Sequence, residues 1–131
     1  MKIFVLDDDV NRHKLFNERL INEGVEIFSF FNANDFCDEI HKHSDVDFIF
    51  LDHDLADFGE NSFISGYGVG EINGSHVASQ IVEMEHMNPD VEIVIHSVNP
   101  VGAQRMKDIL SPWFKVSHVP FPVLMVTLKV I

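Results

Sequence analysis

The sequence is poor in basic residues and almost free of cysteine, and both shortages narrow what the protein can be. It carries 9 Lys and Arg against 21 Asp and Glu, for a formal net charge of −12. This balance argues against a protein that binds nucleic acid broadly, because such binding depends on many Lys and Arg contacts to phosphates. The single cysteine, Cys37, excludes an intrachain disulfide and a zinc site built from several cysteines.

Long apolar runs and targeting signals are also missing. No apolar run reaches the roughly 18 residues of a membrane span, and the first residues lack the basic, apolar and small-residue order of a secretion signal. We therefore expect a cytoplasmic protein that makes no membrane contact. The 131 residues suffice for one domain, 1–131, whose core needs no disulfide to stabilise it.

Short apolar segments alternate with helical patterns along most of the chain. This alternation is typical of a three-layer α/β fold, with a parallel sheet between two layers of helices. Right-handed crossovers favour the flavodoxin-like strand order 2-1-3-4-5. The expected strands are 1–6, 25–31, 47–51, 91–95 and 115–119, and the expected helices are 11–23, 32–43, 74–85 and 100–110.

Two segments depart from the alternation. Residues 55–73 contain four glycines and predict a long loop, which in a compact domain usually serves as a lid or is partly disordered. Residues 123–131 are apolar up to the last residue, and their β-branched content predicts an extra C-terminal strand, with a helix as the alternative. The same segment is a candidate contact for a homodimer.

Polar clusters follow three of the expected strands, at the points where the apolar runs end. Ligands of open parallel sheets bind beyond the carboxyl ends of the strands, near the point where the strand order reverses, so we expect the clusters to converge. Capping of the next helix is the simpler interpretation for any single aspartate, Asp9 among them. The clusters are Asp7-Asp8-Asp9, Asp52-His53-Asp54, and His96-Ser97 with Asn99.

Converging carboxylates repel one another unless a proton, a cation or a basic side chain neutralises them. Carboxylate oxygens in a cleft at the strand ends suit Mg²⁺ or Mn²⁺. Asp8 and Asp52 are the first candidates for metal ligands, and Asp7 and Asp54 are the next.

Two histidines in the clusters are candidates for proton transfer, because imidazole titrates near neutral pH. Side-chain alternation would point His53 away from Asp52 and Asp54 unless the strand has already ended, so His96 is the stronger catalytic candidate. Metal ligation or ordinary hydrogen bonding are alternatives for both. Five further histidines are expected at the surface: His13, His41, His43, His86 and His118.

Candidate phosphate contacts lie at the starts of two helices. Arg12 follows the first acidic cluster by about one helical turn and could bind a phosphate with two N–H groups or pair with an aspartate. Asn99 and Gly102 flank the start of the helix 100–110, where free backbone N–H groups favour anions.

The acids after the first strand, the aspartate after the third and the βα alternation resemble the receiver domain of response regulators, over about residues 1–121. The resemblance implies that these acids bind Mg²⁺ and that Asp52 accepts a phosphoryl group from a histidine kinase. A receiver also has Thr or Ser after strand 4 and Lys before Pro after strand 5. Here His96 or Ser97 stands at the first position and Val119 replaces the lysine, which argues against a working phosphorelay.

These departures are similar to a narrower family, the cyclic-phosphate-processing receiver-like domains. The shared motifs are an acidic run followed by Arg12, the Asp-His-Asp-Leu that starts at Asp52, Asn73-Gly74 before a helix, and a His-Ser-x-Asn pattern that extends from His96 to Met106. The resemblance implies an activity on cyclic phosphates and adds Asn73 and Ser97 to the candidate phosphate-binding residues.

Three functions are compatible with these patterns. The first is a phosphodiesterase that uses Mg²⁺ or Mn²⁺ to open a cyclic phosphate, either a 2′,3′-cyclic RNA end or a cyclic nucleotide signal, with His96, His53 and Asp52 as catalytic residues. The second is a non-catalytic module that binds a nucleotide or a partner protein. The third is a degenerate receiver phosphorylated on Asp52.

Overall fold

The computed structural model describes residues 1–55, 73–84 and 86–128. Five strands form one parallel sheet in the order β2-β1-β3-β4-β5, which confirms the predicted order and fold class. The elements are β1 (Lys2–Leu6), α1 (Val10–Leu20), β2 (Glu26–Phe30), α2 (Ala33–Ile40), β3 (Phe48–Leu51), α3 (Gly74–Glu83), β4 (Glu92–Ile95), α4 (Pro100–Leu110), β5 (Lys115–His118) and α5 (Phe121–Thr127).

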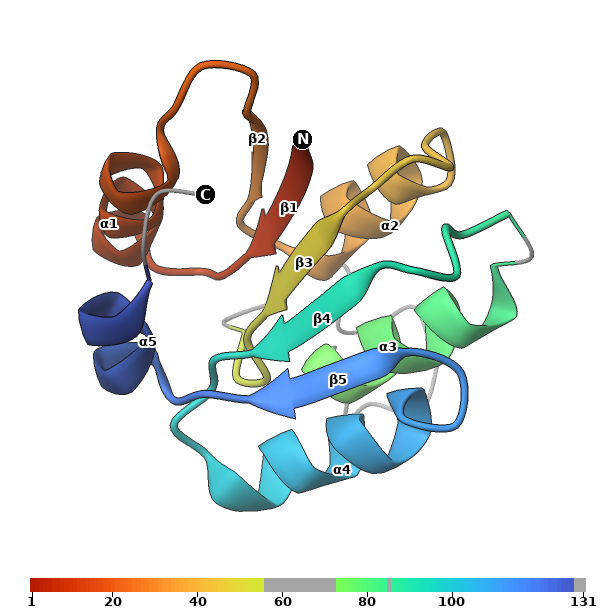
Figure 1. Ribbon diagram of the computed structural model, residues 1–131. Coiled ribbons are helices and arrows are strands. Elements are labelled where there is room, and N and C mark those ends of the chain that lie inside the picture. Colours follow the sequence, from red (N-terminus) through yellow and green to blue (C-terminus); the bar gives the residue numbers. More distant parts are fainter. Residues whose placement is uncertain (56–72, 85, 129–131) are drawn as a thin grey trace.

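Helices cover both faces of the sheet (Figure 1). Because side chains alternate along a strand, β1 supplies Phe4 and Leu6 to a core beneath α2, α3 and α4, and Ile3 and Val5 to a second core beneath α1 and α5. β3 and β4 divide their side chains between the same two cores. This division decides on which face a side chain lies at the end of each strand.

The C-terminal segment is a helix, so the prediction of an extra strand over 123–131 was wrong. Phe121, Leu124, Met125 and Leu128 recur at helical spacing and pack on the core beneath α1, whereas Val126 between them is 83% exposed. Pro122 lies in the first turn, where the missing N–H breaks no helical hydrogen bond. Packing of this apolar stripe therefore outweighs the β propensity of the valines. Residues 129–131 lie outside the described residues.

The predicted glycine-rich loop and the expected absence of a membrane span are the two remaining expectations about the fold. The predicted glycine-rich loop 55–73 falls almost entirely on residues 56–72, which lie outside the described residues. Among the described helices, none is long and apolar enough to cross a membrane.

Gly74 fixes the position of α3 against the loop that follows β3. Its N–H donates to the carbonyl of His53 at 2.9 Å, and Asn73 caps the helix by accepting from the N–H of Ser75. A Cβ on Gly74 would lie 2.4 Å from the carbonyl oxygen of Asp52. Only glycine allows the backbone of α3 to approach this closely.

We predict that Gly74→Ala destabilises the protein by about 1–3 kcal/mol, because the methyl group would collide with backbone atoms that have little room to move. Urea denaturation measures this change in the free energy of unfolding. Gln80→Ala, an exposed substitution on the same helix, is the control and should change stability by no more than about 0.5 kcal/mol. Equal stability of the two variants would contradict the close approach.

Candidate functional site

Side-chain alternation brings three of the predicted residues together just beyond the strands. The parallel hydrogen bonding continues for one residue past β1, β3 and β4, where the N–H groups of Asp7, Asp52 and His96 donate to neighbouring strand carbonyls at 2.9–3.0 Å. Because Leu6, Leu51 and Ile95 all face the core beneath α2–α4, the next residue of each strand faces α1. The ligand atoms of Asp7, Asp52 and His96 consequently lie within 4.8 Å of one another.

Asp7 lies at the centre of this group and is fully buried. Its Oδ2 accepts a hydrogen bond from His96 Nε2 at 2.8 Å, and the same oxygen lies 2.8 Å from Arg12 Nε. Its Oδ1 accepts from Arg12 Nη2 at 3.0 Å and from the N–H of Asp9 at 2.9 Å. Both oxygens are therefore engaged by donors, as a buried carboxylate requires.

Arg12 joins the two buried carboxylates of the site. Its Nη2 lies 3.3 Å from Asp52 Oδ2 and 3.5 Å from Asp8 Oδ1. Asp9 caps α1 by accepting from the N–H of Arg12, which places the guanidinium above the strand ends and confirms the capping role considered for Asp9. The ring of Phe121 lies 5.7 Å from the guanidinium carbon.

The two buried carboxylates hold their protons very differently. Burial alone would raise the pKa of Asp7, but hydrogen bonds from His96 and Arg12 outweigh it, so the pKa of Asp7 lies below its usual value. Burial and the nearby charge of Asp7 raise the pKa of Asp52 to about 7, and Arg12 offsets only part of this. Asp7 is therefore the ionised member of the pair and Asp52 the member that takes up a proton.

His96 is held as a neutral hydrogen-bond donor. The side chain is 1% exposed, and this burial lowers the pKa of His96 below its usual value. Because ionised Asp7 can only accept, His96 Nε2 must carry the hydrogen of their bond. The rings of Phe16 and Phe121 lie edge-on to the imidazole, with centroids 5.1 and 6.1 Å away.

His53, Asp54 and Asn99 form a second group on the other face of the sheet. His53 Nδ1 lies 2.8 Å from Asp54 Oδ1, which also accepts from Asn99 Nδ2 at 3.2 Å. Asn99 Oδ1 caps α4 by accepting from the N–H of Gly102. A Cβ on Gly102 would lie 2.4 Å from the His53 ring, so this glycine makes room for the imidazole.

The structure divides the predicted metal ligands between these two groups. Asp7 and Asp52 lie together, whereas Asp8 is at the edge of the site beside Arg12 and Asp54 lies with His53. Asp54 does not share a face with Asp52, because β3 ends at Leu51, which is the condition under which the alternation was not expected to continue to residue 54.

The remaining predicted phosphate contacts serve turns and helix starts in the structure. Ser97 is buried, and its Oγ accepts from the N–H of Asn99 at 3.0 Å. Asn73 Oδ1 is occupied by the α3 cap, as Asn99 Oδ1 is by the α4 cap. The NH₂ group of Asn73 is therefore the part left to contact a ligand, whereas the NH₂ group of Asn99 already donates to Asp54.

Sequence reasoning missed three residues that support the site. His13, expected at the surface, is 4% exposed, and its Nε2 lies 2.7 Å from the carbonyl oxygen of Asp7. Phe16 and Phe121 pack against His96. The signal for His13 and Phe16 was their spacing from Leu20 on the buried face of α1, whereas Phe121 depends on the unforeseen helix α5.

Comparison with protein-family models identifies the chain. The model described as the cyclic-phosphate processing receiver domain matches residues 1–112. The chain belongs to this family. Membership confirms the resemblance carried by Arg12, the motif starting at Asp52, Asn73-Gly74 and the pattern from His96 to Met106. No curated protein matches the chain.

Solved structures confirm the receiver fold for this family member. A response-regulator domain from Carboxydothermus hydrogenoformans is 13% identical with a TM-score of 0.65, and the match covers 98% of this chain and 87% of that one. Response regulator TrrA from Thermotoga maritima, solved with Mg²⁺ and BeF, is 22% identical with a TM-score of 0.61, covering 91% and 84%. At these identities the likeness establishes the fold alone.

We predict that the free energy of unfolding of Asp52→Asn exceeds that of wild type by an amount that grows as the pH rises. Asp52 binds its proton more tightly in the folded than in the unfolded chain, so wild type loses stability between about pH 4 and pH 7, whereas the asparagine variant does not. The gain should be small at pH 4 and approach an upper limit of about 4 kcal/mol at pH 8, since one pKa unit corresponds to about 1.36 kcal/mol. Urea denaturation at both pH values measures it.

Asp54→Asn is the matched control for this experiment. A hydrogen bond from His53 lowers the pKa of Asp54, so ionisation of Asp54 stabilises the fold above the unfolded pKa and the variant should gain nothing as the pH rises. The same pH response in both variants would show that the burial of Asp52 beside Asp7 is not its cause.

Proposed function

We propose that the protein hydrolyses a cyclic phosphate ester at the carboxyl edge of its sheet, with the help of a divalent cation. The substrate would be a 2′,3′-cyclic RNA end or a cyclic nucleotide signal. One observation carries the proposal: ligand atoms of Asp7, Asp52 and His96 lie within 4.8 Å of one another, beside the partly exposed Arg12. Membership in the cyclic-phosphate processing family supports the choice of substrate.

The donor set fits Mg²⁺ or Mn²⁺. Asp7 and Asp52 offer carboxylate oxygens, and Asp8 at the edge of the site offers another. Burial and the charge of Asp7 raise the pKa of Asp52 to about 7, so a cation bound here would favour the ionised form of Asp52. A bound cation would supply Lewis-acid polarisation of the phosphate and a lower pKa for an attacking water.

Arg12 is the residue best placed to orient the phosphate. Its side chain is 29% exposed and already lies within ion-pair distance of Asp7 and Asp52, at the place where an anion would approach a cation on these carboxylates. A guanidinium can donate two parallel hydrogen bonds to phosphate oxygens. The ring of Phe121, whose centroid lies 5.7 Å from the guanidinium carbon, limits the directions in which Arg12 can turn.

Hydrolysis requires two proton transfers. A bond forms between a water oxygen and phosphorus while one ester bond of the ring breaks, so the water loses a proton and the departing oxygen gains one. His96 is the proposed carrier, because its ring lies within the acidic group, with Nε2 bonded to Asp7. His53 lies on the other face of the sheet, where Asp54 fixes its Nδ1.

A non-catalytic module that binds a nucleotide or a partner protein is the second candidate. The position of Arg12 favours it, because the guanidinium pairs with both Asp7 and Asp52 without any metal. Such a module would bind a cyclic nucleotide through Arg12 and release it intact. Phosphorylation of Asp52 receives less support, since Val119 takes the place of the receiver lysine.

We predict that the purified protein with Mn²⁺ adds one water to at least one member of a panel of cyclic mononucleotides, cyclic dinucleotides and RNA with a 2′,3′-cyclic end. Mass analysis of the products measures this. Asp52→Asn should lower turnover at least about 100-fold, because even groups that only orient metal ligands cost 10–100-fold when removed. No product from any member of the panel would overturn the proposed activity.

The stability of Asp52→Asn shows whether a loss of activity in this variant results from lost chemistry or from unfolding. Asp52→Asn is expected to be at least as stable as wild type at pH 8, so inactivity of this variant cannot be ascribed to unfolding. Asp54→Asn serves as the charge-matched control for metal binding and should retain Mn²⁺ affinity. A ligand that binds and is recovered unchanged would establish the binding module instead.

A further inference from the structure

Phe31 exposes an aromatic ring at the carboxyl edge of the sheet, one residue beyond the end of β2. It is 44% exposed, and no other phenylalanine among residues 1–55, 73–84 and 86–128 is exposed. Exposed aromatic rings are the surfaces on which nucleic-acid-binding proteins stack bases. The position of this ring relative to the acidic group of Asp7, Asp52 and His96 therefore decides whether it can contact the proposed substrate.

The backbone places Phe31 directly beside Asp7. Leu6 and Phe30 are partners in the β1–β2 register, and the N–H of Asp7 donates to the carbonyl of Phe30 at 3.0 Å, so the pairing extends one residue past the strands. Backbones paired in this way lie about 5 Å apart. Both partners face the core beneath α2, α3 and α4, so the residues that follow them face α1. Phe31 and Asp7 consequently lie on the same face of the sheet.

His13 connects the ring to the acidic group. Its Nε2 lies 2.7 Å from the carbonyl oxygen of Asp7 and 3.0 Å from that of Phe30, and it donates to both, because a carbonyl oxygen can only accept. The imidazole packs against Phe31, with ring centroids 4.2 Å apart. His13 is buried, so it is covered by one side of the Phe31 ring, and the exposed part of that ring is the part that does not contact His13.

The distance between the ring and the acidic group suits a nucleoside cyclic phosphate. A phosphate oriented by Arg12 would lie against Asp7 and Asp52. In a nucleoside 2′,3′-cyclic phosphate the base and the phosphate are separated by a single ribose ring. Phe31 is on the strand next to that of Asp7, so the base can reach its ring while the phosphate stays at the acidic group. Stacking on a phenyl ring is tolerant of the identity of the base.

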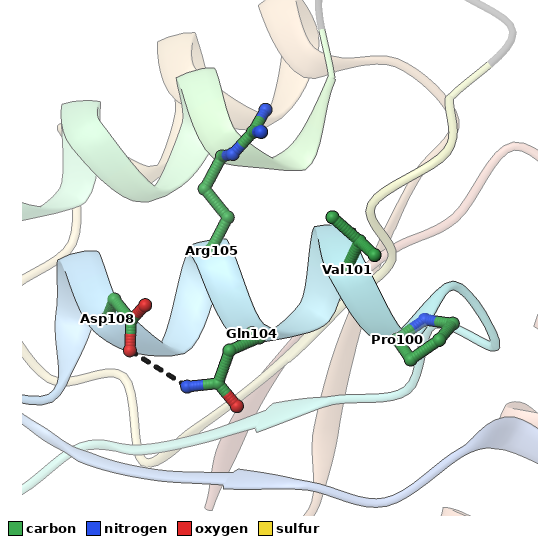
Figure 2. A pocket seen from close by; sticks show the side chains of 5 residues that line it. All are labelled: Pro100, Val101, Gln104, Arg105 and Asp108. Atoms are coloured by element: carbon green, nitrogen blue, oxygen red, sulfur yellow. Dashed lines mark hydrogen bonds between the residues drawn. The ribbon is translucent and has the colours of Figure 1, made fainter.

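α4 carries another exposed apolar surface, which lacks an aromatic ring. Figure 2 shows this shallow hollow along α4, lined by Pro100, Val101, Gln104, Arg105 and Asp108. Val101 is 69% exposed, more than Phe31. None of the lining residues belongs to the acidic group, and none has a ring on which a base could stack. The hollow is therefore a suitable comparison for the surface at Phe31.

We infer that Phe31 is the surface on which the base of a nucleoside cyclic phosphate stacks, so that the protein prefers cyclic phosphates that carry a base. This inference rests on the proposed function, since it assumes that the phosphate lies at the acidic group. Covering His13 requires only an apolar side chain, whereas stacking requires an aromatic one. The two roles therefore respond differently to leucine and to tryptophan at position 31.

Equilibrium binding of two ligands tests the inference, with Ca²⁺ in place of Mn²⁺ to limit turnover. They are 2′,3′-cyclic AMP and methyl riboside 2,3-cyclic phosphate, which has the same cyclic phosphate but no base. Phe31→Leu should weaken binding of 2′,3′-cyclic AMP about 5-fold or more, because leucine still covers His13 but cannot stack on a base. Binding of the methyl riboside should not change. Val101→Ala is the control and should change neither affinity.

Tryptophan fluorescence provides a second test, which does not depend on the stability of the leucine variant. Trp113 is the only tryptophan in the sequence, and it is 65% exposed, so Trp113→Phe is expected to leave the fold intact. Phe31→Trp in this background places the sole indole at position 31. 2′,3′-cyclic AMP should bind this variant at least as tightly as wild type and quench its emission by stacking, whereas the methyl riboside should not quench it.

Several results would overturn the stacking role. These are equal affinities of wild type for the two ligands, equal weakening of both ligands by Phe31→Leu, and unchanged binding of 2′,3′-cyclic AMP in that variant. A larger effect of Val101→Ala than of Phe31→Leu, or equal quenching by both ligands, would also overturn it.

Turnover with Mn²⁺ distinguishes this failure from failure of the proposed function. Hydrolysis of 2′,3′-cyclic AMP by wild type and Phe31→Leu with the same KM would retain the activity and remove the stacking role. Selective weakening of 2′,3′-cyclic AMP by Phe31→Leu, without hydrolysis of any cyclic phosphate, would retain the stacking role and remove the activity.

Discussion

The site depends on one buried carboxylate, that of Asp7, and on the two side chains that stabilise its charge. A fully buried aspartate could not stay ionised without donors, and Arg12 and His96 provide them at 2.8–3.0 Å. Their hydrogen bonds give Asp7 the negative charge and leave Asp52, a few ångströms away, as the carboxyl that takes up a proton. The neighbouring aromatic rings of Phe16 and Phe121 maintain the dry surroundings on which this inequality depends.

The sheet separates the polar side chains at its carboxyl edge into two groups, one on each face. Residues that directly follow the strands face α1, while His53 packs against Gly102 of α4. Family motifs that are hard to explain as ligands have a simple role in this arrangement. Gly74 and Gly102 allow α3 and α4 to approach the loop after β3, and Asn73 and Asn99 cap those helices. The motifs therefore shape the edge of the sheet as much as they supply its chemistry.

The sequence predicted the strand order and the meeting of Asp7, Asp52 and His96 at the strand ends, because both follow from the alternation of apolar segments. It did not predict that His53, Asp54 and Asn99 would form a separate group. It did not predict which acid would be central. Asp8 was preferred over Asp7, although continuing the alternation of β1 by one residue places Asp7 on the buried face. The helix over Phe121–Thr127 was missed because its stabilisation comes from packing on α1, which no local propensity reveals. His13 was misplaced although its spacing from Leu20 puts it on the buried face of α1.

The site depends on the unequal titration of Asp7 and Asp52, which NMR of their side-chain carboxyl carbons measures. In metal-free protein, the Asp52 carboxyl should titrate with a midpoint near pH 7, while that of Asp7 should titrate below the usual aspartate range. Asparagine substitutions at the two positions assign the signals. Midpoints near pH 4 for both carboxyls would contradict this inequality, because Arg12 and His96 would then not favour charge on one aspartate over the other.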